Sequence, residues 1–247
     1  MSTFSCNDPK DLANCAKLID KGGVIIFPTD TVFGIGCDPT NEVSVLKLYN
    51  IKNRSLTKIL PLLTFSKTMV TKVAQINSAA QILMDLFWPG QLTIIMKAKE
   101  DNIGLSKYVT DDINSSIALR IPNNDCLQEL IKATKCKFLV GTSANLSQQP
   151  SSNKLTKINA ELISKCDAIF MDNVQKELEQ VNKTTKSKSI TLGKAMDTSD
   201  TSDTDINKSN LKTESTIVDI TNELKPRIIR EGAVPKDKII DALKVTS

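Results

Sequence analysis

The stretch from Gly22 to Asp38, GGVIIFPTDTVFGIGCD, constrains the fold of this chain more than any other. An apolar run from Val24 to Phe27 predicts a buried strand, and Pro28 ends it because proline cannot donate to a sheet ladder. The polar cluster TDT follows at once. Two glycines come next, at which the backbone can approach a ligand closely or take a positive φ. This order predicts a site at the carboxyl end of a strand in an α/β sheet, although an ordinary polar turn shares the same local pattern.

Strands and helices are expected to alternate along the rest of the chain, which predicts an α/β fold with a mixed sheet. The expected helices cover residues 9–21, 42–51, 79–87, 125–134, 157–164 and 236–243. The expected strands cover residues 24–27, 59–63, 92–97, 116–121, 138–141, 168–171, 216–220 and 227–230.

Length and composition limit the class of protein. With 247 residues, the chain should form one large domain or one domain with an appendage. No apolar window is long enough for a membrane-spanning helix, and the start MSTFSCNDPKDL lacks the pattern of a signal peptide, so a cytoplasmic location is expected. The net charge of +4 is too small to indicate a nucleic-acid binder by itself. The six cysteines are scattered without a CxxC pair, and we expect ordinary reduced thiols with no metal site.

The chain contains no histidine, which excludes whole classes of active site. Ser-His-Asp and Cys-His triads, HExxH zinc sites and histidine general bases all need that residue. Any chemistry must therefore use lysine, arginine, carboxylates, hydroxyls, backbone amides or a metal held by oxygen.

Residues 175–214 differ in composition from the rest. They are rich in Thr, Ser, Lys and Asp, as in TTKSKS and DTSDTSDTD, and they contain no aromatic residue. Such a stretch buries too little apolar surface to offset the entropy of ordering it, so it is predicted to be a disordered insertion.

Basic and hydroxyl residues indicate an anion site. Lys52 and Arg54 come at the end of an expected helix with Lys58 shortly after, and Arg120 and Arg230 stand near the ends of expected strands. The segment GTSANLS follows another strand, and its hydroxyls and backbone N–H groups could cradle a phosphate. Each feature alone is typical of solvated charges or Ser/Thr turns. Together they favour a site for phosphate or carboxylate.

Seven motifs in order carry a family resemblance: PTDTVFGIG, KNR, WPGQLT, ALRIP, GTSANLS, STIVD and IIREGAV. The series resembles the YrdC-like family of threonylcarbamoyl-AMP synthases. The resemblance implies an α/β fold with a twisted mixed sheet flanked by helices and a basic concave face, formed by residues 8–174 and 215–244. It also implies an enzyme, a nucleotidyltransferase that makes threonylcarbamoyl-AMP and pyrophosphate from L-threonine, bicarbonate and ATP with Mg²⁺. The product would pass to a threonylcarbamoyl transferase that modifies tRNA.

The resemblance also implies roles for individual residues. Lys52 and Arg54 would grip the ATP phosphates as the catalytic cations, and both are expected to be exposed. The residues implied for threonine are Thr29, Thr31, Arg120 and Ser215. The further residues implied for ATP are Lys58, Ser116, Gly141, Ser143, Asn145 and Arg230. No residue is implied as a metal ligand.

Three positions depart from the family pattern. Ser55 replaces a common proline, Leu63 replaces a histidine of some members, and Gln148 replaces a glycine. Two other functions stay open. One is a non-catalytic, double-stranded RNA-binding or ribosome-assembly role, in which a basic concavity attracts RNA or tRNA weakly through phosphates. The other is the carbamoyl-adenylate chemistry of hydrogenase-maturation proteins, although their acylphosphatase and zinc-finger modules are missing here.

Overall fold

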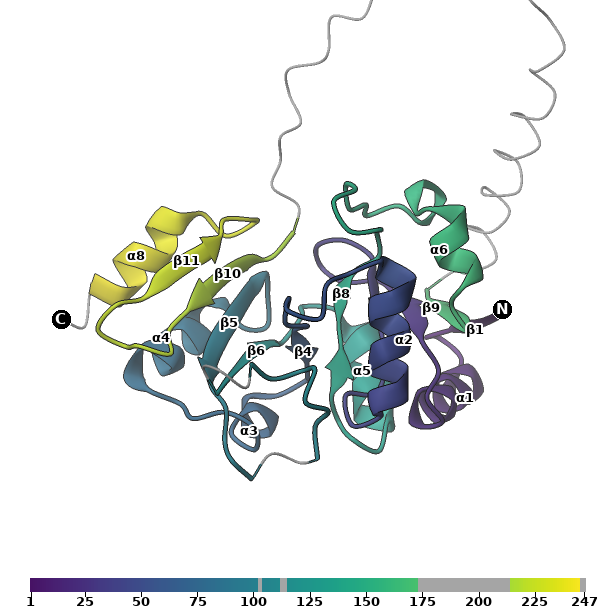
Figure 1. The fold of residues 1–247 in the computed structure, drawn as a ribbon, viewed down its shortest axis with the longest axis horizontal. Coiled ribbons are helices and arrows are strands. Elements are labelled where there is room, and N and C mark those ends of the chain that lie inside the picture. Colours follow the sequence, from purple (N-terminus) through teal and green to yellow (C-terminus); the bar gives the residue numbers. More distant parts are fainter. Residues whose placement is uncertain (102–103, 112–114, 173–213, 245–247) are drawn as a thin grey trace, which may run out of the picture.

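The computed structural model describes residues 1–101, 104–111, 115–172 and 214–244, which form two mixed sheets with helices packed around them (Figure 1). The predicted insertion lies outside the described residues, apart from its last residue, Glu214. Among the described residues, no helix has both the length and the apolar character needed to cross a membrane.

The first sheet has five strands in the order β1-β9-β2-β3-β8. Their bounds are Ser2–Ser5 (β1), Ala168–Met171 (β9), Ile25–Phe27 (β2), Gly34–Gly36 (β3) and Thr142–Ser143 (β8). Strands β1, β9 and β2 run parallel, whereas β3 is antiparallel to both β2 and β8. The connection between β2 and β3 therefore reverses the chain directly after the predicted strand, and it carries the TDT cluster.

The second sheet has six strands in the order β11-β10-β5-β6-β4-β7. Their bounds are Arg227–Arg230 (β11), Thr216–Asp219 (β10), Leu92–Lys97 (β5), Ser116–Arg120 (β6), Leu62–Leu63 (β4) and Leu139–Val140 (β7). The pairs β10–β5 and β4–β6 are parallel, and the other three pairs are antiparallel. The chain passes from this sheet to the first at Gly141, which lies between β7 and β8.

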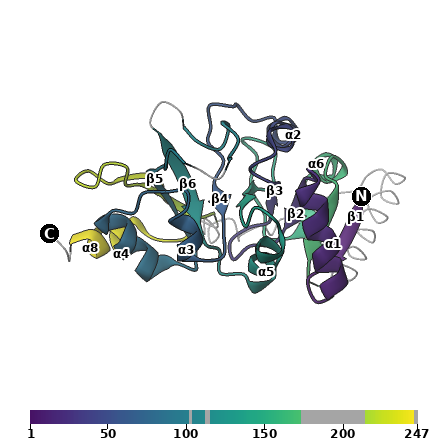
Figure 2. The ribbon, with the colours of Figure 1, turned by 90° about the horizontal axis from the view of Figure 1, so that it is seen from below.

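Helices cover the sheets on several sides, as Figures 1 and 2 show. Their bounds are Pro9–Asp20 (α1), Glu42–Lys52 (α2), Lys67–Val70 (α3), Ser78–Phe87 (α4), Asp125–Ala133 (α5), Ala160–Ser164 (α6) and Lys236–Lys244 (α8), with a 3₁₀ turn over Leu155–Lys157. Successive side chains of β2 point to opposite faces of the sheet, and each face borders its own hydrophobic core. Ile25 and Phe27 pack in a core with α1 and α5, whereas Ile26 packs in a larger core that includes residues of α2. Helices α4 and α8 pack against each other beside the second sheet, as Figure 1 shows on its left side.

The α/β class is confirmed, with two mixed sheets where a single one was predicted. Three strands were missed. Strand β1 precedes the first predicted element, and β3 and β8 contain glycine or small hydroxyl residues that indicate turns in isolation. The helix predicted over 157–164 is wrong in extent, because Asn159 caps a separate helix, α6, after the 3₁₀ turn.

The expectation of reduced cysteines is wrong for one pair. Cys6 and Cys126 form a disulfide across a sequence separation of 120, with their Cα atoms 5.6 Å apart. Cys6 directly follows β1, and Cys126 lies in the first turn of α5. Helices α1 and α5 pack together, which brings these distant segments into contact. Spacing along the chain could not reveal the pair, since it depends on that packing.

Candidate functional site

A cavity of about 330 Å³ lies between the two sheets. The first sheet contributes the β2–β3 connection and Gly34, and the second contributes side chains of β5, β6, β10 and β11. Arg54 and Lys58, which follow α2, close another side. Its charged lining residues are Arg54, Lys58, Arg120, Arg230 and Glu214. Four cations and one carboxylate make the cavity suited to an anionic ligand.

The two threonines of PTDT are fixed by hydrogen bonds. Thr29 Oγ1 donates to the carbonyl of Val32 at 2.6 Å and accepts from the Thr31 amide at 3.0 Å. Because the Thr29 hydroxyl hydrogen is used in this way, the 2.9 Å contact between the two Oγ1 atoms has Thr31 as its donor. Both hydroxyls line the cavity, at the place that the sequence predicts.

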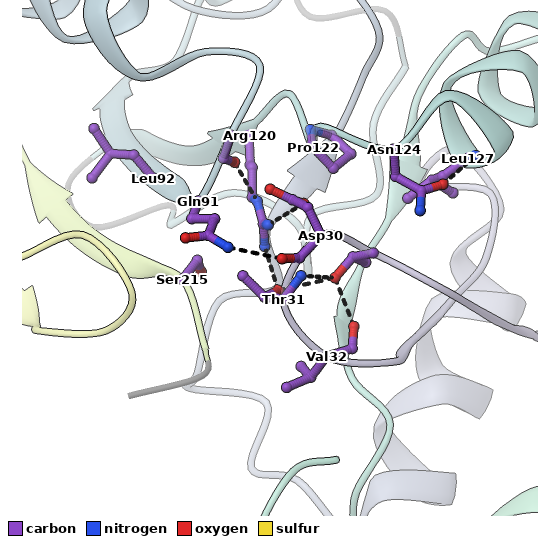
Figure 3. Close-up of polar contacts among 12 residues, drawn as sticks. Asp30, Thr31, Val32, Gln91, Leu92, Arg120, Pro122, Asn124, Leu127 and Ser215 are labelled. Atoms are coloured by element: carbon purple, nitrogen blue, oxygen red, sulfur yellow. Dashed lines mark hydrogen bonds and ion pairs between the residues drawn. The ribbon is translucent and has the colours of Figure 1, made fainter. Parts of the chain in front are cut away.

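Arg120 reaches the same cluster from the end of β6, as Figure 3 shows. Its Nη1 donates to Thr31 Oγ1 at 3.1 Å, and its Nη2 forms an ion pair of 2.5 Å with Asp30 Oδ1. Its Nε donates to the carbonyl of Gly90 at 2.9 Å. Burial lowers the pKa of Arg120 below its usual value, and Asp30 opposes that change. The side chain lines the cavity although it is almost fully buried.

Arg230 and Ser215 meet at another wall of the cavity. The Nε and Nη2 atoms of Arg230 donate to the carbonyl of Ser215 at 3.2 and 2.8 Å. Arg230 also forms an ion pair with Glu214. Ser215 Oγ contacts Thr93 Oγ1 at 2.9 Å across the β10–β5 pair. The C-terminal segment 214–230 thus supplies one cation, one carboxylate and one hydroxyl to the site, and β5 adds the hydroxyl of Thr93.

The two basic residues of the KNR motif lie on opposite sides of a turn at Asn53. Helix α2 begins at an Asn41 cap and ends at Lys52, and Asn53 takes a left-handed conformation with φ 48°. Asparagine tolerates this conformation at a helix end. The chain turns there, and Arg54 lines the cavity, where its Nε and Nη2 donate to the carbonyls of Lys58 and Ile59 at 3.2 and 3.0 Å.

Lys52 points away from the cavity lining and into the GTSANLS segment. Its side chain donates to the Ser143 carbonyl, to the Asn145 carbonyl at 2.7 Å and to Asn145 Oδ1 at 3.2 Å. Its own carbonyl accepts from the amide and hydroxyl of Ser147, both at 3.0 Å. Lys52 is only 2% exposed, so the expectation of an exposed lysine is wrong. Burial and Arg54 lower the pKa of Lys52 to about 7, and Glu214 opposes the change.

The structure brings most of the implied site residues together. The residues that line the cavity are Thr29, Thr31, Arg54, Lys58, Arg120, Gly141, Ser143, Ser215 and Arg230. Lys52 and Asn145 lie behind this lining, in contact with Ser143. Ser116 stands at the opposite end of β6 from Arg120 and pairs with Asp111, away from the cavity lining.

The residue roles that the sequence implied omit Asp30, Gln91, Thr93 and Glu214. Asp30 lies inside the PTDT motif, but the residues next to it in the sequence do not predict that it pairs with Arg120. Thr93 and Gln91 belong to the WPGQLT motif, so the motif order could have indicated them. Glu214 was assigned to the predicted insertion by composition, yet it lines the cavity.

Two departures from the family pattern have structural consequences. Gln148 has a φ of 70°, which favours glycine, so the residue is strained at a position where the family commonly has glycine. Leu63 adds apolar surface to the cavity. Among the described residues, no group of three or more Cys, Asp or Glu side chains is arranged to hold a metal ion.

The family model and the individual relatives that match this chain point to the same family. The Sua5_yciO_yrdC family model, described as "Telomere recombination", matches residues 17–192. A protein of Methanocaldococcus jannaschii is 36% identical over 154 residues, which cover 62% of this chain and 70% of that protein. The threonylcarbamoyl-AMP synthase of Blochmanniella pennsylvanica is 35% identical over 162 residues, covering 64% of this chain and 79% of the synthase.

Solved structures show the same fold. P. abyssi Sua5, crystallised with L-threonine, superposes with a TM-score of 0.72 at 22% identity. The match covers 98% of this chain but 60% of Sua5, which is the longer protein. E. coli YciO superposes with a TM-score of 0.70 at 18% identity, covering 97% of this chain and 99% of YciO.

Proposed function

Because this chain belongs to the Sua5/YciO/YrdC family, we propose that it is a threonylcarbamoyl-AMP synthase, a nucleotidyltransferase acting on L-threonine, bicarbonate and ATP. The observation that carries the proposal is the cavity, which joins two ordered threonine hydroxyls and four cations in one space. A relative with this activity is 35% identical. A relative of the same fold was crystallised with L-threonine.

The chemistry needs anion binding more than a protein nucleophile. The threonine amine condenses with bicarbonate to give a carbamate, and the amine proton and the bicarbonate hydroxyl leave as water. A carbamate oxygen then attacks the α-phosphorus of ATP while pyrophosphate leaves. Both the attacking carbamate and the departing pyrophosphate are anionic. Positioning of the reactants and fixed positive charge lower the barrier of such a transfer. The absence of histidine from the chain is compatible with this mechanism.

We assign the threonine end of the cavity to Thr29, Thr31 and Arg120. Arg120 would bind the carboxylate of the substrate threonine with its guanidinium. The hydroxyls of Thr29 and Thr31 would bind the other polar groups of the substrate. We assign the phosphate end to Arg54, Lys58 and Arg230 with the Ser143 segment. We assign Ser215, whose hydroxyl contacts that of Thr93, to the threonine end as well. Mg²⁺ would enter bound to ATP and neutralise phosphate charge there.

The product and the cellular setting remain proposals. Threonylcarbamoyl-AMP would pass to a transferase that acts on tRNA, and direct binding of tRNA or double-stranded RNA would be weak. The predicted cytoplasmic location stays a prediction of the sequence.

Pyrophosphate release tests the proposal. Purified protein with ATP and Mg²⁺ should release pyrophosphate when both L-threonine and bicarbonate are present, and little when either is omitted. Equal release with and without threonine would reject the synthase assignment. RNA binding measured on the same preparation would then be the function to pursue.

A matched pair of variants tests the phosphate end. Arg54→Ala should weaken the use of ATP by roughly 2–4 kcal/mol, as is typical when one charged partner of a phosphate is removed. Lys47→Ala removes a cation on the preceding helix that pairs with Asp167 and does not line the cavity, so its kinetics should match the wild type. Normal ATP kinetics in Arg54→Ala would show that the phosphates bind elsewhere.

A further inference from the structure

We infer that Asp30 is a positioning residue that sets the orientation of Arg120, and through it the binding of the substrate carboxylate. The part of this inference that concerns threonine rests on the proposed function. Asp30 does not line the cavity, whereas Arg120 does. The Asp30 side chain therefore acts on a ligand through its side-chain partner, Arg120.

The contacts fix the guanidinium on three sides (Figure 3). Nη2 meets Asp30 Oδ1 at 2.5 Å, Nε donates to the Gly90 carbonyl at 2.9 Å, and Nη1 donates to Thr31 Oγ1 at 3.1 Å. The Asp30 backbone is held in turn, because Gln91 Nε2 donates to its carbonyl at 2.8 Å. A planar guanidinium with three directed contacts has one orientation, which is what bidentate recognition of a carboxylate requires.

These contacts also join the two sheets. Asp30 and Thr31 lie in the β2–β3 connection of the first sheet, whereas Arg120, Gly90 and Gln91 belong to β6 and to the segment before β5 in the second. The cavity lies between those sheets. The orientation of Arg120 therefore depends on the position of one sheet relative to the other, and Asp30 carries the charged link.

Burial makes the pairing necessary. The side chains of Arg120 and Asp30 are 7% and 11% exposed. A buried guanidinium without a counter-charge is strongly unfavourable, and it would shift toward water or the nearest remaining acceptor. The carboxylate that lines the cavity, Glu214, is paired with Arg230. Asp30 is thus the acid that compensates Arg120.

The single contact that Asp30 makes with Arg120 allows two variants that separate the effect of charge from the effect of orientation. Asp30 Oδ2 is buried and has no hydrogen-bond partner among the described residues, so only Oδ1 serves Arg120. Asp30→Asn keeps an acceptor near Oδ1 and removes the charge. Asp30→Glu keeps the charge and displaces the carboxylate by one methylene group. If charge balance alone matters, Glu should substitute well; if orientation matters, it should not.

Calorimetric titration with L-threonine tests the inference on the full chain. We expect Asp30→Asn and Asp30→Glu each to weaken threonine binding at least about tenfold. ATP binding should stay within about twofold, and in steady-state kinetics the KM for threonine should rise more than kcat falls. The matched control is Asp219→Asn, which breaks the ion pair of 2.7 Å with Arg227 outside the cavity and should leave both affinities unchanged.

A second measurement separates this inference from the proposed function. In the ¹⁵N NMR spectrum of the wild type, Arg120 Nε–H should give a distinct, slowly exchanging signal, assigned by its loss in Arg120→Lys. Asp30→Asn should shift that signal or broaden it, with or without substrate. If the wild type shows neither threonine binding nor threonine-dependent pyrophosphate release, the proposed function fails, and the NMR result alone decides the inference.

Three results would overturn the inference. The first is wild-type threonine affinity in Asp30→Glu, and the second is an unchanged Arg120 signal in Asp30→Asn. The third is failure of both Asp30 variants to fold, because Asp30 would then hold the sheets together rather than orient Arg120.

Discussion

At the scale of single residues, the two cations of the KNR motif point in different directions. Lys52 is buried against the GTSANLS segment, and Arg54 lines the cavity. Asn53 separates them by ending α2 in a left-handed turn. Removal of the Lys52 side-chain amine leaves the partly buried carbonyls of Ser143 and Asn145 without this donor, and an unsatisfied buried group costs about 1–3 kcal/mol. Removal of the Arg54 side chain leaves the core intact.

This difference gives a first prediction. Lys52→Met should lower the melting temperature clearly and loosen the Ser143–Asn145 segment, whereas Arg54→Ala should change stability little. Thermal unfolding followed by circular dichroism measures both variants side by side. Equal melting temperatures for the wild type and Lys52→Met would contradict the role of Lys52 in holding that segment.

The lowered pKa of Lys52 gives a pH-dependent prediction. The folded value is about 7 and the ordinary value is 10.5, so between these limits the unfolded chain binds more protons at this position. The free energy of unfolding contributed by Lys52 therefore rises as the pH increases from about 7 to about 10. Chemical denaturation should show the wild type gaining stability relative to Lys52→Met over this range. Lys47→Met, which removes a 40% exposed side chain from the same helix, should show no comparable gain.

Gln148 offers a prediction of increased stability. Its φ of 70° is unfavourable for a residue with a Cβ atom, and glycine takes this conformation readily. Gln148→Gly should raise the free energy of unfolding by up to about 1 kcal/mol. Relief of the backbone strain stabilises the folded state, and the greater entropy of the unfolded chain with glycine offsets part of that gain. Denaturant unfolding compares the two proteins. A loss of stability would mean that contacts of the Gln148 side chain outweigh the backbone strain.

At the scale of elements, the short strand β3 depends on close packing. A Cβ atom on Gly36 would lie 1.7 Å from the carbonyl oxygen of Val140, the last residue of β7 in the other sheet. The overlap involves backbone, which cannot turn aside as a flexible side chain would. Gly36 is therefore needed for the approach of the two sheets rather than for contact with a ligand.

Gly36→Ala should accordingly destabilise the fold by about 3 kcal/mol or more, which exceeds the usual cost of overpacking by one methyl group. Gly104→Ala is the comparison, since no atom of the described residues, its chain neighbours aside, lies within 4 Å of the Cβ that it would add. That variant carries only the conformational cost of a φ of 74°, about 1 kcal/mol. Similar stability losses in the two variants would show that β3 can move away from Val140.

At the scale of the whole molecule, the Cys6–Cys126 disulfide closes most of the first half of the chain. Alkylation of the denatured protein without reductant should modify only the four free cysteines, Cys15, Cys37, Cys136 and Cys166. Mass spectrometry then counts the modified thiols. Reduction, or replacement of Cys6 and Cys126 by serine, should lower the free energy of unfolding by about 2–4 kcal/mol. Six modified thiols before reduction would show that the pair is not joined.

The sequence by itself determined most of the elements and four of the five charged residues that line the cavity. The pattern placed α1, α2, α4 and α5 to within about two residues, because all four have a recognisable polar cap and α1, α4 and α5 each have one apolar face. Motif order assigned the cavity residues to strand ends and to the turn after α2. Periodicity and caps are local properties, so a single stretch of chain is enough to reveal them.

Only the tertiary structure decided which side chains face the cavity and which support it. The Asp30–Arg120 pair, the Lys52 contacts with Ser143 and the Cys6–Cys126 bond join residues separated by 90 or more positions. Such contacts depend on how two sheets and their helices meet, and no local pattern encodes that geometry. The position of each residue in the fold decides its role. Lys52 orders the Ser143–Asn145 segment, Arg54 faces the cavity, and Asp30 holds Arg120 in place.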